Sequence, residues 1–259
     1  MTYQKGSKGE MVKKIQTALN ITADGIFGAK TEEAVKKFQS DKGLVADGIV
    51  GEKTLSLLFP SDGINIVNGH IKTHITQSPN RPIKYIAIHY TAGASSARGA
   101  ALRTRNVFLK PKRKASADFV VDDAEIVQIN PDLCNYYCWG VGDQKNKTTG
   151  GGKLYGIATN RNTVSIEICS NLKTGRNAAY PNTDGWYYTE ASLENARKLV
   201  RYLMAKYNVP KSNVVRHYDV SGKMCPGVIG WNDAPTYTDD GKQKGKNNSN
   251  QWLEFWNSI

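Results

Sequence analysis

The sequence contains few cysteines and no long apolar run, and each absence excludes a class of protein. Its 259 residues include four cysteines, too few for a disulfide-rich scaffold, so we expect a reducing compartment. No window approaches the roughly 18 uninterrupted apolar residues of a membrane-spanning helix. The first lysines are not followed by an apolar segment, so the sequence shows no secretory signal and any export uses another route.

Motifs of nucleic-acid-binding and zinc-knuckle proteins are also missing. The net charge of +12 and the pI ≈ 9.4 indicate attraction to polyanions, whether nucleic acid, anionic lipid or acidic cell-wall polymers. We find no recognition helix, finger or aromatic-studded sheet that would favour nucleic acid. Cys134 and Cys138 lack the second cysteine pair of a zinc knuckle, which leaves a disulfide or a share in another metal site as alternatives.

Residues 1–60 contain an internal repeat with a period of 23 residues. The first copy, A-D-G-I-F-G-A-K-T-E-E-A-V-K-K-F, begins at Ala23, and the second, A-D-G-I-V-G-E-K-T-L-S-L-L-F, begins at Ala46. In each copy Asp-Gly supplies a turn and the next Gly allows another bend. We expect Thr31 and Thr54 to cap the helices that follow.

These sixty residues predict a small three-helix module. Val12, Ile15 and Leu19 have the spacing of a first amphipathic helix. The D-G-x-x-G pattern lacks the alternating oxygen ligands and terminal Glu of a calcium loop, so turn formation explains it better. The segment resembles the helical peptidoglycan-binding domain, whose hallmark is D-G-x-x-G-x-x-T followed by an A-V-x-x-F-Q helix. A helical bundle of unrelated purpose is the alternative.

Residues 61–79 are predicted to be a linker, because they are rich in Ser, Asn, Asp, Gly and Pro. His70 and His74 stand four apart there, but no acidic base lies between them as in H-E-x-x-H, so we interpret them as surface residues. We therefore place a second domain at residues 80–259.

The second domain is predicted to be α/β (α+β), with a mixed central sheet flanked by helices. Apolar runs indicate strands at Lys84–His89, Asp118–Val121, Ile126–Ile129 and Thr163–Cys169. Ser95 is expected to cap one helix, and Thr189 begins another with a long apolar stripe that ends before Asn208. Gly150–Gly152 and the polar run at residues 238–250 are predicted to be flexible, and Trp252, Phe255 and Trp256 indicate a short C-terminal helix.

A candidate metal site lies in Arg216–Pro226, which reads R-H-Y-D-V-S-G-K-M-C-P. His217 and Cys225 are good zinc ligands, although unrelated packing is the alternative for such a pair. His89 ends a predicted strand and would complete a set of three protein ligands with one position open for water.

Two charged residues are candidates for the chemistry at this site. Glu167 is an acid inside an otherwise apolar strand, which makes it our candidate general base, taking a proton from water and passing it to a leaving amine. The alternative is an ion pair with a nearby Arg or Lys. Lys223 would place a cation beside the oxyanion that forms when a carbonyl is attacked, whereas a lone lysine is ordinarily a surface charge.

Four motifs in order resemble the type 2 zinc N-acetylmuramoyl-L-alanine amidases, a family that includes phage lysozyme-like amidases and peptidoglycan recognition proteins. They are I-A-I-H-Y-T-A-G, S-A-D-F-V-V-D-D-A-E-I-V-Q-I-N-P, N-x-V-S-I-E-I-C and R-H-Y-D-V-S-G-K-M-C-P-G, within residues 80–230. The resemblance implies a zinc cofactor. It also implies that His89, His217 and Cys225 bind the zinc, that Lys223 stabilises the oxyanion and that Glu167 is the catalytic acid. Residues expected to contact the substrate are Tyr90, Asn162, Trp139 and Asp118.

The sequence departs from the family pattern at three places. Asp118 stands where many relatives have a histidine, and Ala117 replaces a tyrosine that some members use in catalysis, so that role falls to Glu167. A histidine often found near the position of Trp139 is also absent.

The resemblance predicts a zinc hydrolase that cleaves the amide bond between N-acetylmuramic acid and L-alanine in peptidoglycan. We expect a phage endolysin that stays in the host cytoplasm until a holin releases it to the cell wall, which it then lyses. Its partners would be peptidoglycan and anionic wall polymers, with no nucleic acid, no membrane and no second copy of the chain. A non-catalytic peptidoglycan-binding protein and a basic nucleic-acid-binding protein are the rival hypotheses.

Overall fold

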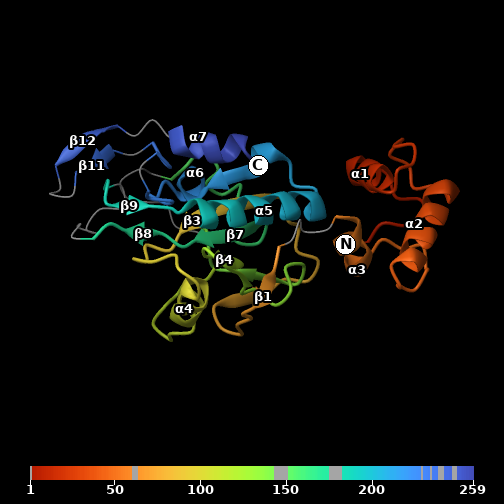
Figure 1. Cartoon of the computed structure of the whole chain (residues 1–259), viewed down its shortest axis with the longest axis horizontal. Helices are drawn as coiled ribbons and strands as arrows, with labels where there is room; N and C mark the ends of the chain where they lie inside the picture. Colours follow the sequence, from red (N-terminus) through yellow and green to blue (C-terminus); the bar gives the residue numbers. More distant parts are fainter. Residues whose placement is uncertain are drawn as a thin grey trace. The chain divides into compact units, whose positions relative to one another are not determined.

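The chain forms two compact units in the computed structural model (Figure 1), which describes residues 2–59, 64–142, 151–174, 183–228, 230–233, 235–238, 242–246 and 250–259. One unit contains Met1–Gly63 and Tyr202–Asn208, and the other contains Ile64–Arg201 and Val209–Ile259. None of the helices in the described part of the chain is both long and apolar enough to cross a membrane.

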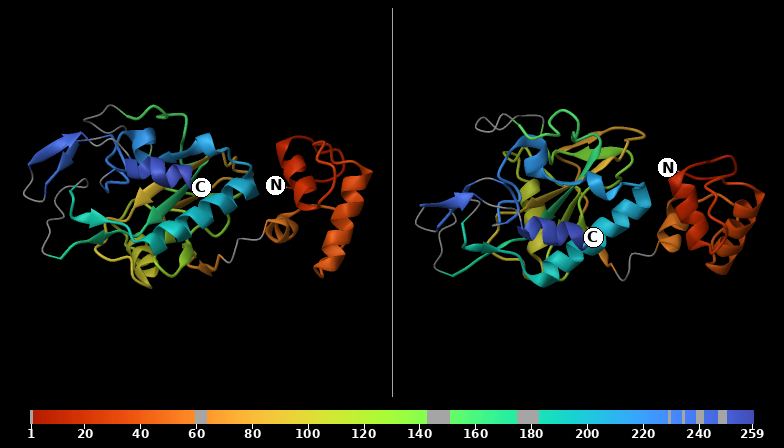
Figure 2. Two further views of the ribbon diagram at one scale, coloured as in Figure 1. Left: turned by 45° about the horizontal axis from the view of Figure 1, so that its top comes forward. Right: turned by 90° about the horizontal axis from the view of Figure 1, so that it is seen from above.

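The N-terminal unit has the three predicted helices, α1 (Glu10–Ala18), α2 (Ala29–Asp41) and α3 (Glu52–Leu58). Figure 2 shows these helices from two further sides, and they surround a core of their own. The buried apolar residues of this core are Met11, Val12, Ile15, Phe27, Val35, Val50, Leu55 and Leu58.

The expected capping role of Thr31 and Thr54 is wrong. The helices begin after Gly28 and Gly51, so both threonines lie inside a first turn. Each hydroxyl instead accepts a hydrogen bond from the side-chain amide of a buried glutamine, at 3.0 Å for Thr31 and 3.1 Å for Thr54.

A glutamine holds each Asp-Gly turn of the repeat. Gln16 donates from Nε2 to Asp24 Oδ1 at 2.7 Å and to Ile26 O at 3.0 Å, and its Oε1 accepts from Gly25 N at 2.8 Å. Gln39 repeats these contacts 23 residues later with Asp47, Gly48 and Ile49. The repeat therefore includes a glutamine in the helix that precedes each turn.

The second unit is built on a six-stranded mixed sheet, which confirms the predicted fold class. The strand order is β1 (Ile66–Asn68), β5 (Ile126–Gln128), β4 (Phe119–Val121), β7 (Thr163–Ile168), β3 (Tyr85–Tyr90) and β10 (Val214–Arg216). Neighbouring strands are parallel except for the predicted hairpin of β4 and β5. Parallel neighbours end at the same edge, so residues at their carboxyl ends are brought together.

Helices cover both faces of this sheet (Figures 1 and 2). His89 and its register partner Glu167 project from one face, together with Val120 of β4. On that face α4 (Ala100–Phe108) packs over β4 and β5, and α6 (His217–Ser221) packs beside β3. The opposite face, fully buried at Ile88 and Ile166, lies under α5 (Glu190–Tyr207).

Smaller elements complete the unit. Three two-stranded sheets pair β2 (Ile75–Gln77) with β6 (Tyr136–Cys138), β8 (Asn171–Leu172) with β9 (Trp186–Tyr187), and β11 (Pro235–Tyr237) with β12 (Gln243–Lys246). A 3-10 turn, Lys211–Asn213, precedes β10. The predicted C-terminal helix is α7 (Asn250–Asn257), whose Trp252 and Phe255 pack on buried Trp231.

Several local predictions differ from the structure. The segment predicted as a linker contributes β1 and β2, and His74 is half-buried, with Nδ1 2.7 Å from Phe108 O. The helix expected after Ser95 begins only at Ala100, and part of the polar run at residues 238–250 forms β12. Gly150 lies outside the described residues. Cys134 and Cys138 are both free thiols, so no disulfide joins them.

Candidate metal centre

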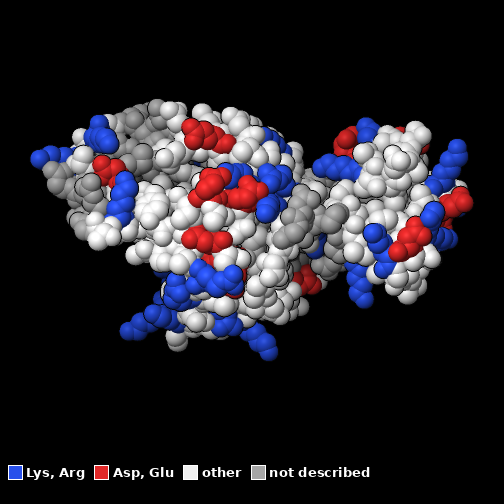
Figure 3. Space-filling view, viewed as in Figure 1, with Lys and Arg blue, Asp and Glu red and all other residues white. Residues whose placement is uncertain are grey.

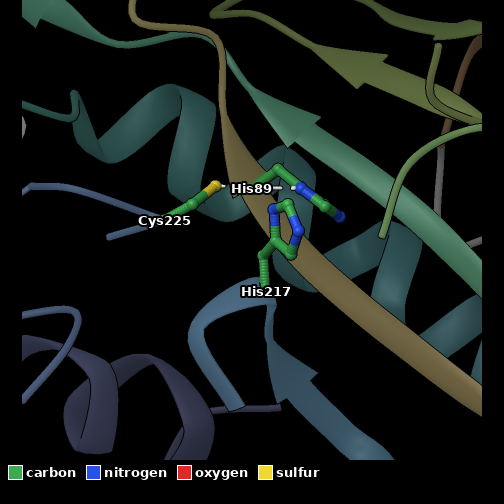
Figure 4. Close-up of side chains that lie close together, drawn as sticks. All are labelled: His89, His217 and Cys225. Carbon is green, nitrogen blue, oxygen red and sulfur yellow. Dashed lines mark hydrogen bonds between the residues drawn. The ribbon is translucent and has the colours of Figure 1, made fainter. Parts of the chain in front are cut away.

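Three side chains from separate parts of the second unit converge on one point (Figure 4). His89 comes from the end of β3, His217 is the first residue of α6, and Cys225 lies in the segment after that helix. One ligand atom from each lies within 4.8 Å of the others. All three are buried, so together they form a group that could hold a metal ion.

The local fold explains this convergence. Parallel pairing sets Arg216 of β10 opposite Ile88 of β3, so the next residue, His217, comes to the side of His89, with ring centroids 4.4 Å apart. Gly222 ends α6 at a φ of 74°, a left-handed conformation that favours glycine and turns the chain back. The backbone N–H of Tyr218 then donates to Cys225 O at 2.8 Å, which closes the loop.

Hydrogen bonding assigns the nitrogens of the two rings. Nε2 of His217 lies 3.0 Å from Val141 O, so this nitrogen carries the proton and Nδ1 is left to accept a cation. Nδ1 of His89 lies 3.7 Å from Cys225 Sγ (Figure 4), while its Nε2 is buried without a partner among the described residues. The two Nδ1 atoms and the sulfur therefore form the donor set.

Burial sets the protonation of these groups in the absence of a cation. It lowers the pKa of His217 to about 4 and that of His89 well below the ordinary value, and the charge of Lys223 acts in the same direction on both. Both imidazoles are thus neutral, the form that ligates metals. Burial raises the pKa of the Cys225 thiol, so binding of a cation displaces its proton.

Glu167 lies beside this group, because it is the register partner of His89 on the neighbouring strand. Its Oε2 is buried without a hydrogen-bond partner among the described residues. Burial raises the pKa of this carboxyl to about 8, and the charges of Lys223 and Arg113 oppose that shift. Lys223 itself is exposed, between α6 and Cys225, and its charge acts on His89, Glu167, His217 and Cys225.

Of the four residues expected to contact substrate, Asp118 has a structural role instead. It is fully buried, and its carboxylate accepts from Arg81 Nη1 at 3.1 Å, Asn130 Nδ2 at 2.6 Å and Ser165 N at 2.8 Å. A buried carboxylate needs such partners, and these contacts keep it away from any substrate. Asp118 therefore forms an ion pair with Arg81 in the core.

The other three residues also have contacts within the fold. Asn162 holds the turn before β7 by accepting from Thr159 N at 2.8 Å. Trp139 donates from Nε1 to Thr76 Oγ1 at 2.9 Å. Tyr90 follows His89 on β3 and meets the edge of Trp186, with ring centroids 5.9 Å apart. Substrate contact by these residues stays a prediction.

The sequence interpretation missed Arg216, which positions α6. Its guanidinium is buried and bonds to Asp219 twice, with Nε–Oδ2 at 3.0 Å and Nη2–Oδ1 at 2.9 Å. Asp219 also accepts from Arg216 N at 3.0 Å, so the pair caps the helix that begins with His217. The signal in the sequence is Asp219, an acid three residues after Arg216, the residue that precedes α6.

Comparison with known proteins agrees with this geometry. Residues 79–228, which contain all three donor residues, match the family model for N-acetylmuramoyl-L-alanine amidase. The chain belongs to the N-acetylmuramoyl-L-alanine amidase family. Residues 8–58 separately match the model of a peptidoglycan-binding domain.

Two N-acetylmuramoyl-L-alanine amidases of Bacillus subtilis are similar to this chain over more than half of its length. The chain is 36% identical to N-acetylmuramoyl-L-alanine amidase CwlH over 143 residues, covering 55% of this chain and 46% of CwlH. It is 33% identical to N-acetylmuramoyl-L-alanine amidase XlyA over 166 residues, covering 63% of this chain and 46% of XlyA. The chain thus spans about half the length of these relatives.

A solved structure of the catalytic domain of XlyA is 28% identical, with a TM-score of 0.45, and the match covers 63% of this chain and 90% of that domain.

Proposed function

We propose that this chain is a zinc-dependent amidase that hydrolyses the bond between the lactyl group of N-acetylmuramic acid and the L-alanine of the peptidoglycan stem peptide. The observation that carries the proposal is the buried donor set of His89, His217 and Cys225 with Glu167 as register neighbour of His89. Membership of the amidase family supports the same reaction.

The donor set fits zinc. With Zn–S of about 2.3 Å and Zn–N of about 2.0–2.1 Å, tetrahedral geometry separates a sulfur and a nitrogen ligand by about 3.5–3.6 Å. The observed separation of Cys225 Sγ and His89 Nδ1 is 3.7 Å. Three ligands leave the fourth position open, as in catalytic sites. Zinc held there would supply the Lewis acidity that makes water a nucleophile near neutral pH.

Glu167 has the properties of a proton carrier. Its Oε2 atom is buried, and its pKa of about 8 lies near enough to neutral for both forms to be populated. The ionised form can accept a proton from the attacking water, and the acid form can deliver it to the leaving nitrogen of L-alanine. Protonation of that nitrogen allows the C–N bond to break and gives a carboxylate on the lactyl group and a free amine on the peptide.

Lys223 would stabilise the negative charge that develops on the carbonyl oxygen. Its positive charge lowers the pKa values of His89, His217, Glu167 and Cys225, which together make up the site. A cation beside a developing oxyanion lowers the barrier to attack on the carbonyl.

The N-terminal unit would hold the enzyme on its polymeric substrate. Its match to a peptidoglycan-binding domain supports this role. Tethering raises the effective concentration of the active site on the polymer even if each contact is weak. Together the two units fit a lytic enzyme of the endolysin type that reaches the bacterial wall after release from the host cytoplasm.

The test compares wild type, Glu167→Ala and Cys225→Ser on purified bacterial walls, measuring released L-alanine amino termini and bound zinc. Wild type should release such termini and carry one zinc ion per chain. Glu167→Ala should keep the zinc and lose the activity, whereas Cys225→Ser should lose both. Full activity and full zinc content in Cys225→Ser would refute the ligand assignment, and inactive wild type would favour a non-catalytic peptidoglycan-binding protein.

A further inference from the structure

A cavity of about 400 Å³ adjoins the face of the sheet that carries Glu167. Its walls come from Thr91–Ser95 after β3, from α4, and from the loop that follows α4. Glu167 is the only carboxylate among the described residues that line it, whereas Arg103 and Arg113 both contribute guanidinium groups. The cavity is therefore open to the proposed catalytic group and positively charged overall.

Among the described residues that line the cavity, Glu167 is the one acid against two arginines, and the charge of Arg113 acts on it. Residues 95–117 contain seven lysines and arginines and no aspartate or glutamate. Arg103 and Arg113 are exposed, and neither forms an ion pair with a carboxylate among the described residues. Figure 3 shows that lysine and arginine side chains gather over α4. An arginine without a protein partner is suited to binding a carboxylate with two parallel hydrogen bonds.

Other cations of the same segment differ from these two. Arg105 donates to Gly69 O at 3.1 Å and to His70 O at 3.2 Å, so it is engaged in holding α4. Lys112 is exposed and does not line the cavity. Arg103 and Arg113 thus both line the cavity, and Glu167 is the one carboxylate that shares it among the described residues.

The proposed substrate is asymmetric in charge about the bond that is cleaved. On the sugar side, the lactyl carboxyl is consumed in the amide and the N-acetylated sugars are neutral. On the peptide side, a stem peptide that is not cross-linked keeps the carboxylate of its chain terminus. A cationic cavity beside the metal centre therefore suits the peptide side.

We propose that Arg103 and Arg113 bind a free carboxylate of the stem peptide in this cavity and so lay the peptide along α4, with the amide carbonyl presented to the metal centre. This inference rests on the proposed function and adds the residues that orient its substrate. Both arginines contact the substrate away from the bond that breaks, so they act on binding more than on the chemical step.

The experiment measures release of L-alanine amino termini from three samples of the same walls. One is untreated, one has its carboxyl groups amidated with carbodiimide and ammonia, and one is stripped of phosphodiester polymers with hydrofluoric acid. The proteins are the zinc-loaded full chain and its Arg103→Gln, Arg113→Gln, double and Lys112→Gln variants. Lys112→Gln removes the same charge from the same segment and is the matched control.

Amidation of the walls should slow wild type about tenfold or more, because it removes a charge-assisted hydrogen-bonded pair, and stripping should not. On untreated walls the double variant should be about as slow as wild type is on amidated walls, because it needs a higher wall concentration for half-maximal rate. Amidation of the walls should slow the double variant no further. Lys112→Gln should behave as wild type. Unchanged melting temperatures and zinc contents verify that the variants fold.

Two results would overturn the inference. The first is that amidation of the walls slows the double variant as much as it slows wild type. The second is that wild type slows on stripped walls and not on amidated walls, which would assign the arginines to phosphodiester polymers. The proposed function fails separately, when wild type releases no L-alanine termini from untreated walls.

Discussion

The carboxyl group of Glu167 lies where burial disfavours its charged form. Its Oε2 is buried and has no hydrogen-bond partner within the described part of the chain. Such a group is retained at functional sites because its shifted pKa matches its task. Its residue type and its place at the end of an apolar strand were enough to nominate it from the sequence. The three metal donors were predicted in the same way, from histidine and cysteine residues in loops or at strand ends, where their side chains can converge.

Replacing Glu167 with Gln keeps the shape of the side chain and removes its ability to carry a proton. We expect kcat on purified walls to fall by about 10²–10⁴-fold, the usual contribution of a general acid–base group. Zinc content should be unchanged, and the melting temperature should not fall, because burial already disfavours the charged form. Glu194→Gln on the exposed side of α5 is the control, and more than half of wild-type activity in Glu167→Gln would contradict the assignment.

The helix that carries His217 depends on a buried ion pair that the motif did not reveal. Arg216 and Asp219 are joined by two hydrogen bonds, and both are less than a tenth exposed. Without Asp219, the guanidinium of Arg216 would keep the longer contact to the exposed Asp233, at 3.4 Å, but most of the compensation of its buried charge would be lost.

Asp219→Asn should therefore destabilise the second unit by about 3 kcal/mol and weaken zinc binding, because α6 no longer holds His217 in place. Denaturant unfolding and a competitive zinc titration measure the two effects. Asp132→Asn, in the turn before β6, is the control for loss of one negative charge. Unaltered zinc affinity in Asp219→Asn would show that α6 holds its position without the pair.

The N-terminal repeat contains carboxylates that link its stability to pH. Asp24 accepts from Ile26 N at 2.8 Å and from Gln16 Nε2 at 2.7 Å, and these bonds lower its pKa below the ordinary 3.8. Asp47 makes the same bonds, with the same direction of shift. A carboxyl whose pKa is lower in the folded state stabilises the fold above its unfolded pKa.

The stability of this unit should therefore be constant from pH 7 to about pH 5 and fall below about pH 4, as each carboxylate is protonated. Thermal unfolding of residues 1–63 followed by circular dichroism measures this. Replacing both Asp24 and Asp47 with Asn should lower the melting temperature at pH 7 and flatten the dependence on pH. An equally steep loss in the double variant would assign the effect to other groups.

At the scale of elements, the pattern of apolar residues predicted the strands, whereas local sequence motifs did not predict the hydrogen-bond partners of single polar residues. The apolar runs located β3, β4, β5 and β7, because buried strands require them. Asp118 was misassigned because its partner Arg81 lies 37 residues away in the sequence, so no local pattern reveals the pair. Thr31 and Thr54 were misassigned because the glutamine that bonds each of them lies 15 residues earlier, in the preceding helix.

At the scale of the whole molecule, two units with separate cores predict separable roles. A chain lacking residues 1–63 should hydrolyse a soluble muramoyl-peptide at the rate of the full chain. On insoluble walls it should be slower by about tenfold or more, since it has lost its tether to the polymer. Equal rates for both proteins on walls would contradict a tethering role for the N-terminal unit.

The most direct test of the account is an inventory of the chain ends that wild type creates in purified peptidoglycan. The account predicts new L-alanine amino termini together with free muramoyl carboxyl groups, no matching rise in reducing sugar ends, and loss of the activity when a chelator removes zinc. New reducing ends, amino termini of other residues in the peptide, or full activity after zinc removal would contradict it.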